Sequence, residues 1–249
     1  MGRRTFVVGD IHGDLDALRK LVGKMPTLEP TDTLVFLGDY VDRGPHSAEV
    51  VEVVRGFQRD AGFEVVCLRG NHEDAWLRVL DRRWDEFVFP PGNGCLATMR
   101  SYTGGPHPEP GTLFTPEEQE SLFSGAFFPA DVVAWFESLP LFHEDEHGIY
   151  VHAGLVETRG RFLHPSEIVP PHAMLWTRTK SFFTDYRGKR VVVGHTVTDC
   201  LPADLSTHTP ADPTDFWAGE CVVAIDTGAG KDGFLTAIEL PALRVWESR

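Results

Sequence analysis

The sequence has no long hydrophobic run, no closely spaced cysteine pair and no basic cluster, and each absence excludes a class of protein. No apolar stretch approaches the roughly 18–20 residues that a membrane-spanning helix needs, so we expect no membrane partner. Without a C-x-x-C pair, a zinc-thiolate site or a disulfide framework is not indicated. The four cysteines are widely scattered: Cys67, Cys95, Cys200 and Cys221.

Acidic residues outnumber basic ones, 37 to 23, and the formal net charge is −14. A chain with this balance has no electrostatic footprint for a long polyanion, so we expect no nucleic-acid partner. If the substrate is an anion, its attraction must come from a few local positive centres, such as metal ions and selected arginines.

The length of 249 residues, 42% of them hydrophobic, is enough for one sizeable core. We therefore expect a single domain over residues 1–249, with irregular excursions near 89–111 and 197–219, where prolines gather. Either excursion is equally consistent with a plain surface loop or with a loop that selects substrate. The apolar run Thr5–Val8 is too short for a signal peptide, and we expect a cytoplasmic protein.

Short apolar runs recur along the chain, and most end in a polar motif. Continuous apolar runs of this length indicate strands buried on both faces. Helical periodicity fills the gaps between the early runs, which predicts an α/β fold with a mainly parallel sheet in the N-terminal half. The predicted strands are Thr5–Val8, Thr33–Leu37, Val65–Leu68, Ile149–Val151, Arg190–Val193, Val222–Ile225 and Leu235–Leu240. Helices are predicted around Leu15–Met25, Val50–Phe57 and Trp76–Trp84, after the capping box at Thr115, and over Ala130–Leu139.

Aspartate, asparagine or histidine stands at the end of five of these strands, where ligands collect in α/β sheets. Singly, such a residue is usually a turn, a cap or a structural histidine, but a whole ordered set is hard to explain as packing. Carboxylate, amide and imidazole without thiolate suit divalent metal ions, and two such ions about 3.5–4 Å apart clamp a phosphoryl group. The candidate ligands are Asp10, His12, Asp39, Asn71, His152 and His195.

The order GDIHG, GDYVDRG, RGNHE, HAG and GHT resembles the phosphoprotein phosphatase family of the calcineurin-like metallophosphoesterases. It is most similar to the small bacterial and bacteriophage Ser/Thr protein phosphatases, and the resemblance extends from about Thr5 to Leu240. It implies two packed mixed β-sheets flanked by helices. It also implies two divalent ions, with manganese expected and iron, zinc, nickel and cobalt as alternatives.

The resemblance assigns a role to each motif residue. Asp10, His12 and Asp39 would hold one ion, whereas Asp39, Asn71, His152 and His195 would hold the other. His72 would be the general acid, paired with Asp42. Arg43 would contact the substrate phosphate, and so would Arg178 in the Leu175-Trp176-Thr177-Arg178 element. One departure, His152-Ala153-Gly154 in place of His-Gly-Gly, leaves the ligand intact.

We therefore expect a phosphomonoesterase, acting on phosphoserine or phosphothreonine in a protein or on a small phosphoester, by in-line attack of a metal-bridging hydroxide. A dinucleoside polyphosphate hydrolase is the alternative, although symmetric tetraphosphatases usually carry alanine at the position of Asp42 and GNHD in place of Gly70–Glu73. A non-catalytic metal-binding regulatory module is a further alternative, but it would have no reason to keep His72. The charge argues against a DNA or RNA phosphodiesterase.

Other polar and aromatic residues have plainer explanations. Glu73 is expected to support the site or to open a helix, and the Asp226-Thr227-Gly228 turn to border the site. Trp76, Trp84 and Trp135 have helical spacing and are expected in the core. The histidines outside the motifs are expected at the surface: His46, His107, His143, His147, His164, His172 and His208.

Overall fold

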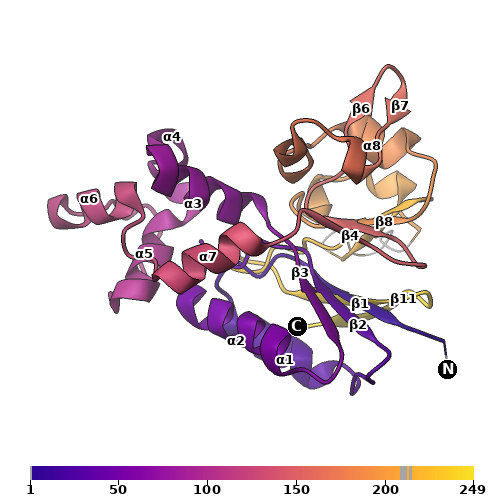
Figure 1. The fold of residues 1–249 in the computed structure, drawn as a ribbon, viewed down its shortest axis with the longest axis horizontal. Coiled ribbons are helices and arrows are strands. Elements are labelled where there is room, and N and C mark those ends of the chain that lie inside the picture. Colours follow the sequence, from indigo (N-terminus) through magenta and orange to yellow (C-terminus); the bar gives the residue numbers. More distant parts are fainter. Residues whose placement is uncertain (1, 208–211, 213–214) are drawn as a thin grey trace.

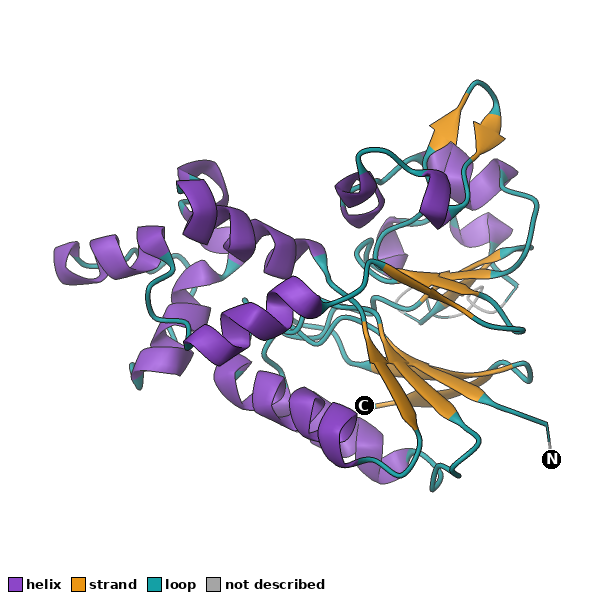
Figure 2. Ribbon diagram, in the orientation of Figure 1, coloured by secondary structure: helices purple, strands orange, loops and turns teal. Residues whose placement is uncertain are grey.

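Two five-stranded β-sheets pack face to face, with helices on their outer faces (Figures 1 and 2). The structure is a computed structural model, and it describes residues 2–207, 212 and 215–249. In Figure 1, α1 and α2 lie beneath the first sheet, while α8 and the β6–β7 hairpin lie above the second. The group from α3 to α7 extends to one side. This confirms the α/β class and the two mixed sheets flanked by helices.

The first sheet has the order β12-β11-β1-β2-β3. The strands β1, β2 and β3 are parallel, as the sequence predicts for the N-terminal half, with Thr5 opposite Thr33 and Thr33 opposite Glu64. The strand β11 returns from the C-terminal end of the chain and pairs antiparallel with β1, so the sheet is mixed. The strands are β1 (Thr5–Val8), β2 (Thr33–Phe36), β3 (Glu64–Cys67), β11 (Thr236–Leu240) and β12 (Arg244–Glu247).

The second sheet has the order β4-β5-β8-β10-β9. Its centre, β5-β8-β10, is parallel, and its edge strands β4 and β9 are antiparallel to their neighbours. The strands are β4 (Phe142–Glu144), β5 (Ile149–Val151), β8 (Val191–Val193), β9 (Trp217–Ala218) and β10 (Val222–Ala224), and a separate hairpin joins β6 (Glu157–Thr158) to β7 (Arg161–Phe162).

The continuous apolar runs are explained by burial on both faces of each sheet. In β8, Val192 packs between the two sheets, whereas Val191 and Val193 pack against the outer layer of the second sheet. In β1, Val7 likewise faces the space between the sheets, and Phe6 faces the helical layer. Side chains alternate across a strand, so a strand covered on both sides needs apolar residues at every position.

The predicted helices form with the expected start signals. Asp14 caps α1 by accepting a hydrogen bond from the backbone N–H of Ala17 at 2.9 Å, and the Thr115–Glu118 capping box opens α6. The helices are α1 (Leu15–Lys24), α2 (Ser47–Asp60), α3 (Asn71–Arg82), α4 (Asp85–Val88), α5 (Cys95–Thr103), α6 (Pro116–Ser124), α7 (Ala130–Ser138) and α8 (Lys180–Asp185). No helix of the described residues is long and apolar enough to cross a membrane.

The segment 89–111 is more ordered than its prolines suggest, because it contains a 3-10 turn at Pro91–Asn93 and the helix α5. Gly94 and Gly104, both in the left-handed region, bound α5 at its two ends. The segment 197–219 has short 3-10 turns at Thr198–Cys200 and Ala203–Leu205 before β9, and it includes residues outside the described ones.

The plainer expectations for aromatic residues and histidines are met in part. Trp76 and Trp135 are buried, and Trp84 packs half-buried against the same core. His107 and His172 are exposed as expected, and His208 lies outside the described residues. The other four are half-buried: His46, His143, His147 and His164.

Candidate active site

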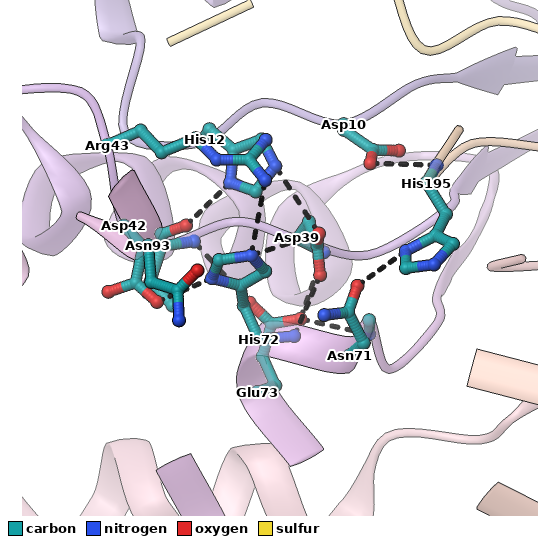
Figure 3. Close-up of polar contacts among 12 residues, drawn as sticks. Asp10, His12, Asp39, Asp42, Arg43, Asn71, His72, Glu73, Asn93 and His195 are labelled. Carbon is teal, nitrogen blue, oxygen red and sulfur yellow. Dashed lines mark hydrogen bonds and ion pairs between the residues drawn. The ribbon is translucent and has the colours of Figure 1, made fainter. Parts of the chain in front are cut away.

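The motif residues converge where strands of the two sheets end. From the first sheet, the turn after β1 supplies Asp10 and His12, the turn after β2 supplies Asp39, Asp42 and Arg43, and the first turn of α3 supplies Asn71 and His72. From the second sheet, His152 follows β5 and His195 follows β8. Every one of these side chains except Arg43, which is half-buried, is buried. Figure 3 shows His12, Asp39 and His72 close together.

The backbone at this site adopts conformations that residues with side chains rarely take. Five non-glycine residues have positive φ: His12 (48°), Asp39 (53°), Asp42 (72°), Arg43 (69°) and His195 (63°). Such conformations cost on the order of 1–3 kcal/mol each and persist only where the surrounding contacts hold them. Their concentration in these turns means that the fold imposes the positions of these side chains.

Asp39 connects two groups of potential metal ligands. Its Oδ2 lies 3.3 Å from Nε2 of His12, and its Oδ1 lies 3.5 Å from Nε2 of His152. One group is His12, Asp39 and His72, and the other is Asp39, His152 and His195; the ligand atoms of each group lie within 4.8 Å of one another. These groups can bind metal ions, and Asp39 belongs to both.

Asn71 and Asp10 complete the cluster from two sides. Oδ1 of Asn71 lies 2.8 Å from Nε2 of His152 and 2.7 Å from Nδ1 of His195. Oδ2 of Asp10 accepts the backbone N–H of His195 at 2.9 Å. A Cβ on Gly194 would come 1.9 Å from Oδ1 of Asp10, and only glycine allows this approach.

The chemistry of these donors fits a cation. His12 donates its Nδ1–H to the carbonyl of Val41 at 2.9 Å, and His152 donates its Nδ1–H to Leu37 at 2.9 Å. Burial lowers the pKa of both imidazoles, so each is neutral and its Nε2 carries a lone pair. These lone pairs face the oxygens of Asp39 and Asn71, an arrangement that a bound cation stabilises.

Buried polar atoms without hydrogen-bond partners also indicate a bound cation. Among the described residues, Oδ1 of Asp10, Nε2 of His12 and Nε2 of His195 are buried without a hydrogen-bond partner. Burial lowers the pKa of His195 to about 2, so this imidazole too is neutral and able to ligate. Buried polar atoms are normally satisfied, and several unsatisfied ones in one place indicate a missing ligand.

The Asp42 carboxylate holds His72 in one orientation. His72 donates its Nδ1–H to Oδ2 of Asp42 at 2.6 Å, while Trp76 Nε1–H (3.0 Å) and the Thr98 hydroxyl (2.6 Å) donate to Oδ1 of Asp42. Burial lowers the pKa of His72, but the carboxylates of Asp39 and Asp42 outweigh burial and raise it overall. The imidazole therefore holds a second proton over a wider pH range than an ordinary histidine.

Thr98 and the polar role of Trp76 could not be found from the motifs. Thr98 lies on α5, inside the segment expected to be irregular, and its hydroxyl also accepts the backbone N–H of Asp42 at 2.7 Å. Trp76 was expected only as a core residue. Both keep the buried Asp42 carboxylate hydrogen-bonded, without which an ionised acid at this depth would be costly.

The two predicted phosphate-binding arginines lie beside the cluster. The guanidinium of Arg43 approaches Nε2 of His72 at 3.5 Å, and Nε of Arg43 is buried without a partner among the described residues. Arg178 donates to the backbone carbonyl of His195 at 3.0 Å and to the Thr196 hydroxyl at 3.3 Å. Both positive charges therefore border the potential metal groups.

Glu73 is buried and supports the turn that carries Asp39. Its carboxylate accepts the backbone N–H groups of Asp39 (2.9 Å), Tyr40 (2.8 Å) and Gly70 (2.9 Å). It thus joins the turn after β2 to the start of α3. Asp226 is also buried, accepts the backbone N–H of Gly228 at 3.1 Å, and its charge raises the pKa of Asp10, after burial itself.

The family profile described as Calcineurin-like phosphoesterase matches residues 3–199. The chain belongs to this family of metallophosphoesterases, hydrolases that use divalent metal ions. This agrees with the two potential metal groups and with the resemblance in the motifs.

Individual relatives carry two different activities in their names. A Caenorhabditis elegans protein named as a candidate serine/threonine-protein phosphatase is 41% identical over 70 residues, which cover 27% of this chain but only 18% of that protein. The asymmetrical bis(5'-nucleosyl)-tetraphosphatase PrpE of Bacillus thuringiensis is 26% identical, and the match covers 95% of this chain and 90% of that protein. The crystal structure of a candidate diadenosine tetraphosphatase has the same fold, with a TM-score of 0.56, 20% identity, and coverage of 98% of this chain and 92% of that one.

Proposed function

We propose that this protein hydrolyses phosphomonoesters, with phosphoserine or phosphothreonine on a protein as the leading substrate, and that two metal ions, manganese first, occupy the site. The observation that carries the proposal is the placement of Asp39 in both potential metal groups, beside the His72–Asp42 pair. The two groups of ligands would bind the metal ions, and the adjacent His72–Asp42 pair would transfer a proton.

Six side chains would hold the ions: Asp10, His12, Asp39, Asn71, His152 and His195. Asp39 supplies an oxygen to each side, the imidazoles present neutral nitrogens, and Oδ1 of Asp10 is free among the described residues to ligate. When bound, such ions lower the pKa of a water molecule and stabilise negative charge on phosphate oxygens.

The chain's own residues would bind the phosphate and protonate the leaving group. Arg43 and Arg178 offer guanidinium donors on the border of the metal groups, where they can hold the non-bridging phosphate oxygens. A water oxygen forms the new bond to phosphorus, in line with the bond that breaks. The leaving alkoxide takes a proton from Nε2 of His72, and Asp42 stabilises the imidazole while it is charged.

A second candidate function is hydrolysis of dinucleoside polyphosphates. One observation favours it: the relative that matches nearly along its full length is named a tetraphosphatase, whereas the match to the serine/threonine phosphatase is short. Asp42 and the motif Gly70-Asn71-His72-Glu73 argue only against the symmetric type of this activity, whereas the relative is named as asymmetrical.

The two candidates are separated by one comparison on a single metal-loaded preparation. We expect kcat/KM for a phosphothreonine peptide to exceed that for diadenosine tetraphosphate, because two arginines suit a terminal phosphate with two charges. A preference of about tenfold or more for the dinucleotide would overturn the leading proposal in favour of the second. The His72→Asn variant is the control, since it reports whether the activity measured belongs to this site.

A further inference from the structure

A tight turn after β10 packs against the backbone of His12, one of the candidate metal ligands. Gly233 and Lys231 donate their backbone N–H groups to the carbonyl of Gly228, at 3.1 and 3.3 Å, and so close the turn. A Cβ on Gly230 would come 2.4 Å from the backbone oxygen of His12, so the turn packs against a candidate ligand. The next residue, Lys231, therefore lies at the rim of the active site.

The ammonium group of Lys231 is a third positive charge beside the two arginines. Its side chain is exposed. The positive charge of Arg43 is the largest cause that lowers the pKa of Lys231, burial is the next, and Arg178 acts in the same direction, whereas the carboxylates of Asp226 and Asp232 act against them. The three cations repel one another, Asp226 and Asp232 offset part of this repulsion, and an anion bound between the cations would relieve the rest.

A cavity of about 580 Å³ lies on the other side of Lys231, between the turn and the segment Val197–Cys200. Its volume is within the range of small-molecule sites. Two carboxylates, Asp199 and Asp232, line it, whereas the guanidinium of Arg249 is engaged by Glu247 and Asp212, both at 2.7 Å. The cavity itself therefore suits an uncharged group with hydrogen-bond donors, and only its Lys231 edge suits an anion.

We propose that Lys231 is a specificity-determining residue that binds a second phosphate, linked to the phosphate at the reacting centre, with the rest of the substrate in the adjoining cavity. The inference rests on the proposed hydrolytic function and deepens its second candidate, whose substrates carry linked phosphates. A simple phosphomonoester would leave Lys231 without a partner.

The test compares two matched phosphonates that the enzyme cannot hydrolyse. Methylphosphonate and methylenediphosphonate are used as inhibitors of p-nitrophenyl phosphate hydrolysis, with metal ions in excess. Wild type should bind the diphosphonate more tightly. In Lys231→Ala the diphosphonate should bind about tenfold more weakly, the loss of one charge-assisted contact, while methylphosphonate is unaffected. Lys231→Arg should keep most of the preference. The diphosphonate chelates metal ions equally in every assay, so this effect cancels when the affinities of the variants are compared.

Lys180→Ala is the matched control, because Lys180 lines a separate cavity beyond Arg178. Equal weakening of both inhibitors by Lys231→Ala, or the same loss of preference in Lys180→Ala, would overturn the inference. Loss of the preference in Lys231→Ala alone would support it, even where diadenosine tetraphosphate is not hydrolysed. A failure to hydrolyse diadenosine tetraphosphate would contradict the second candidate function but not the second phosphate site. Thermal melts of each variant show whether it is folded.

Discussion

The imidazole of His72 and the carboxylate of Asp42 are 2.6 Å apart, in a place where the carboxylate is completely buried. The short bond fixes the tautomer, because the Nδ1–H of His72 is committed to Asp42 and Nε2 faces the site. A histidine held in this way is positioned to give a proton from one known atom. The first two predictions concern this pair.

Loss of the His72 imidazole should reduce kcat most for substrates with poor leaving groups. His72→Asn should reduce kcat for a phosphoserine peptide by about 10²–10⁴-fold, the usual range for a general acid, and should affect an aryl phosphate far less. The reason is that a phenolate leaves without a proton, whereas a serine alkoxide does not. The measurement is kcat on both substrates with the same metal-loaded preparation. Equal losses would mean that His72 only binds or positions.

The Thr98 hydroxyl should matter through Asp42. Thr98→Val keeps the shape but removes the donor to a buried carboxylate, so we expect about a 3- to 10-fold loss of kcat on the phosphoserine peptide, and little change in KM. Thr103→Val is the matched control on the same helix, because within the described part of the chain the Thr103 hydroxyl bonds only to the carbonyl of Met99, at 2.9 Å. A loss in KM alone, or the same loss in the control, would contradict the positioning role.

The difference between Asp42 and Thr98 shows what the sequence can and cannot predict. The strand-end residues were predictable because buried strands have continuous apolar runs, and their ends meet at one edge of a sheet. Thr98 was not, because it is 56 residues from Asp42 and contacts it only after α5 has folded. The prolines around α5 suggested a loop, whereas the helix between two left-handed glycines is stabilised by tertiary packing. The antiparallel pairing of β11 with β1 is equally non-local.

The shared position of Asp39 predicts unequal effects on metal content. Wild type should contain close to two divalent ions per chain by elemental analysis and should lose activity to a chelator. Asp39→Asn should lower the content of both ions, whereas His195→Ala should mainly lower one. His164→Ala, a half-buried histidine paired with Glu144, is the control and should keep both. A single ion in wild type, or full activity after exhaustive chelation, would contradict the two-ion site.

The ion pair between Arg4 and Asp32 should make stability depend on pH. Burial raises the pKa of Asp32, but the bond from Arg4 Nε (3.0 Å) and the backbone N–H of Glu29 (2.7 Å) outweigh it and lower the pKa overall. Because the pKa of Asp32 is depressed in the folded protein, the ion pair stabilises the fold above the unfolded pKa of about 3.9. This stabilisation is lost as the pH falls through the folded pKa.

At neutral pH, Asp32→Asn should therefore lower the free energy of unfolding by about 1–3 kcal/mol, as for a hydrogen bond to a charged group. The gap from wild type should narrow below about pH 4, as the wild-type carboxylate takes up a proton. Urea unfolding at several pH values measures it. Asp60→Asn, whose carboxylate is exposed beside Arg59, should change stability little at any pH. If the difference in the free energy of unfolding between wild type and Asp32→Asn did not change with pH, the stabilising role of the Asp32 charge would be contradicted.

Asp39 follows a strand of the first sheet, whereas His152 and His195, which form a potential metal group with it, follow strands of the second. An ion held by these residues would be a removable cross-link between the two sheets, anchored at points far apart in the chain. Its contribution to stability follows mass action, so the melting temperature should rise with the free metal concentration. The layers share their own apolar interface, which holds them together when the metal is scarce. Metal supply would then set the half-life of the enzyme as well as its rate.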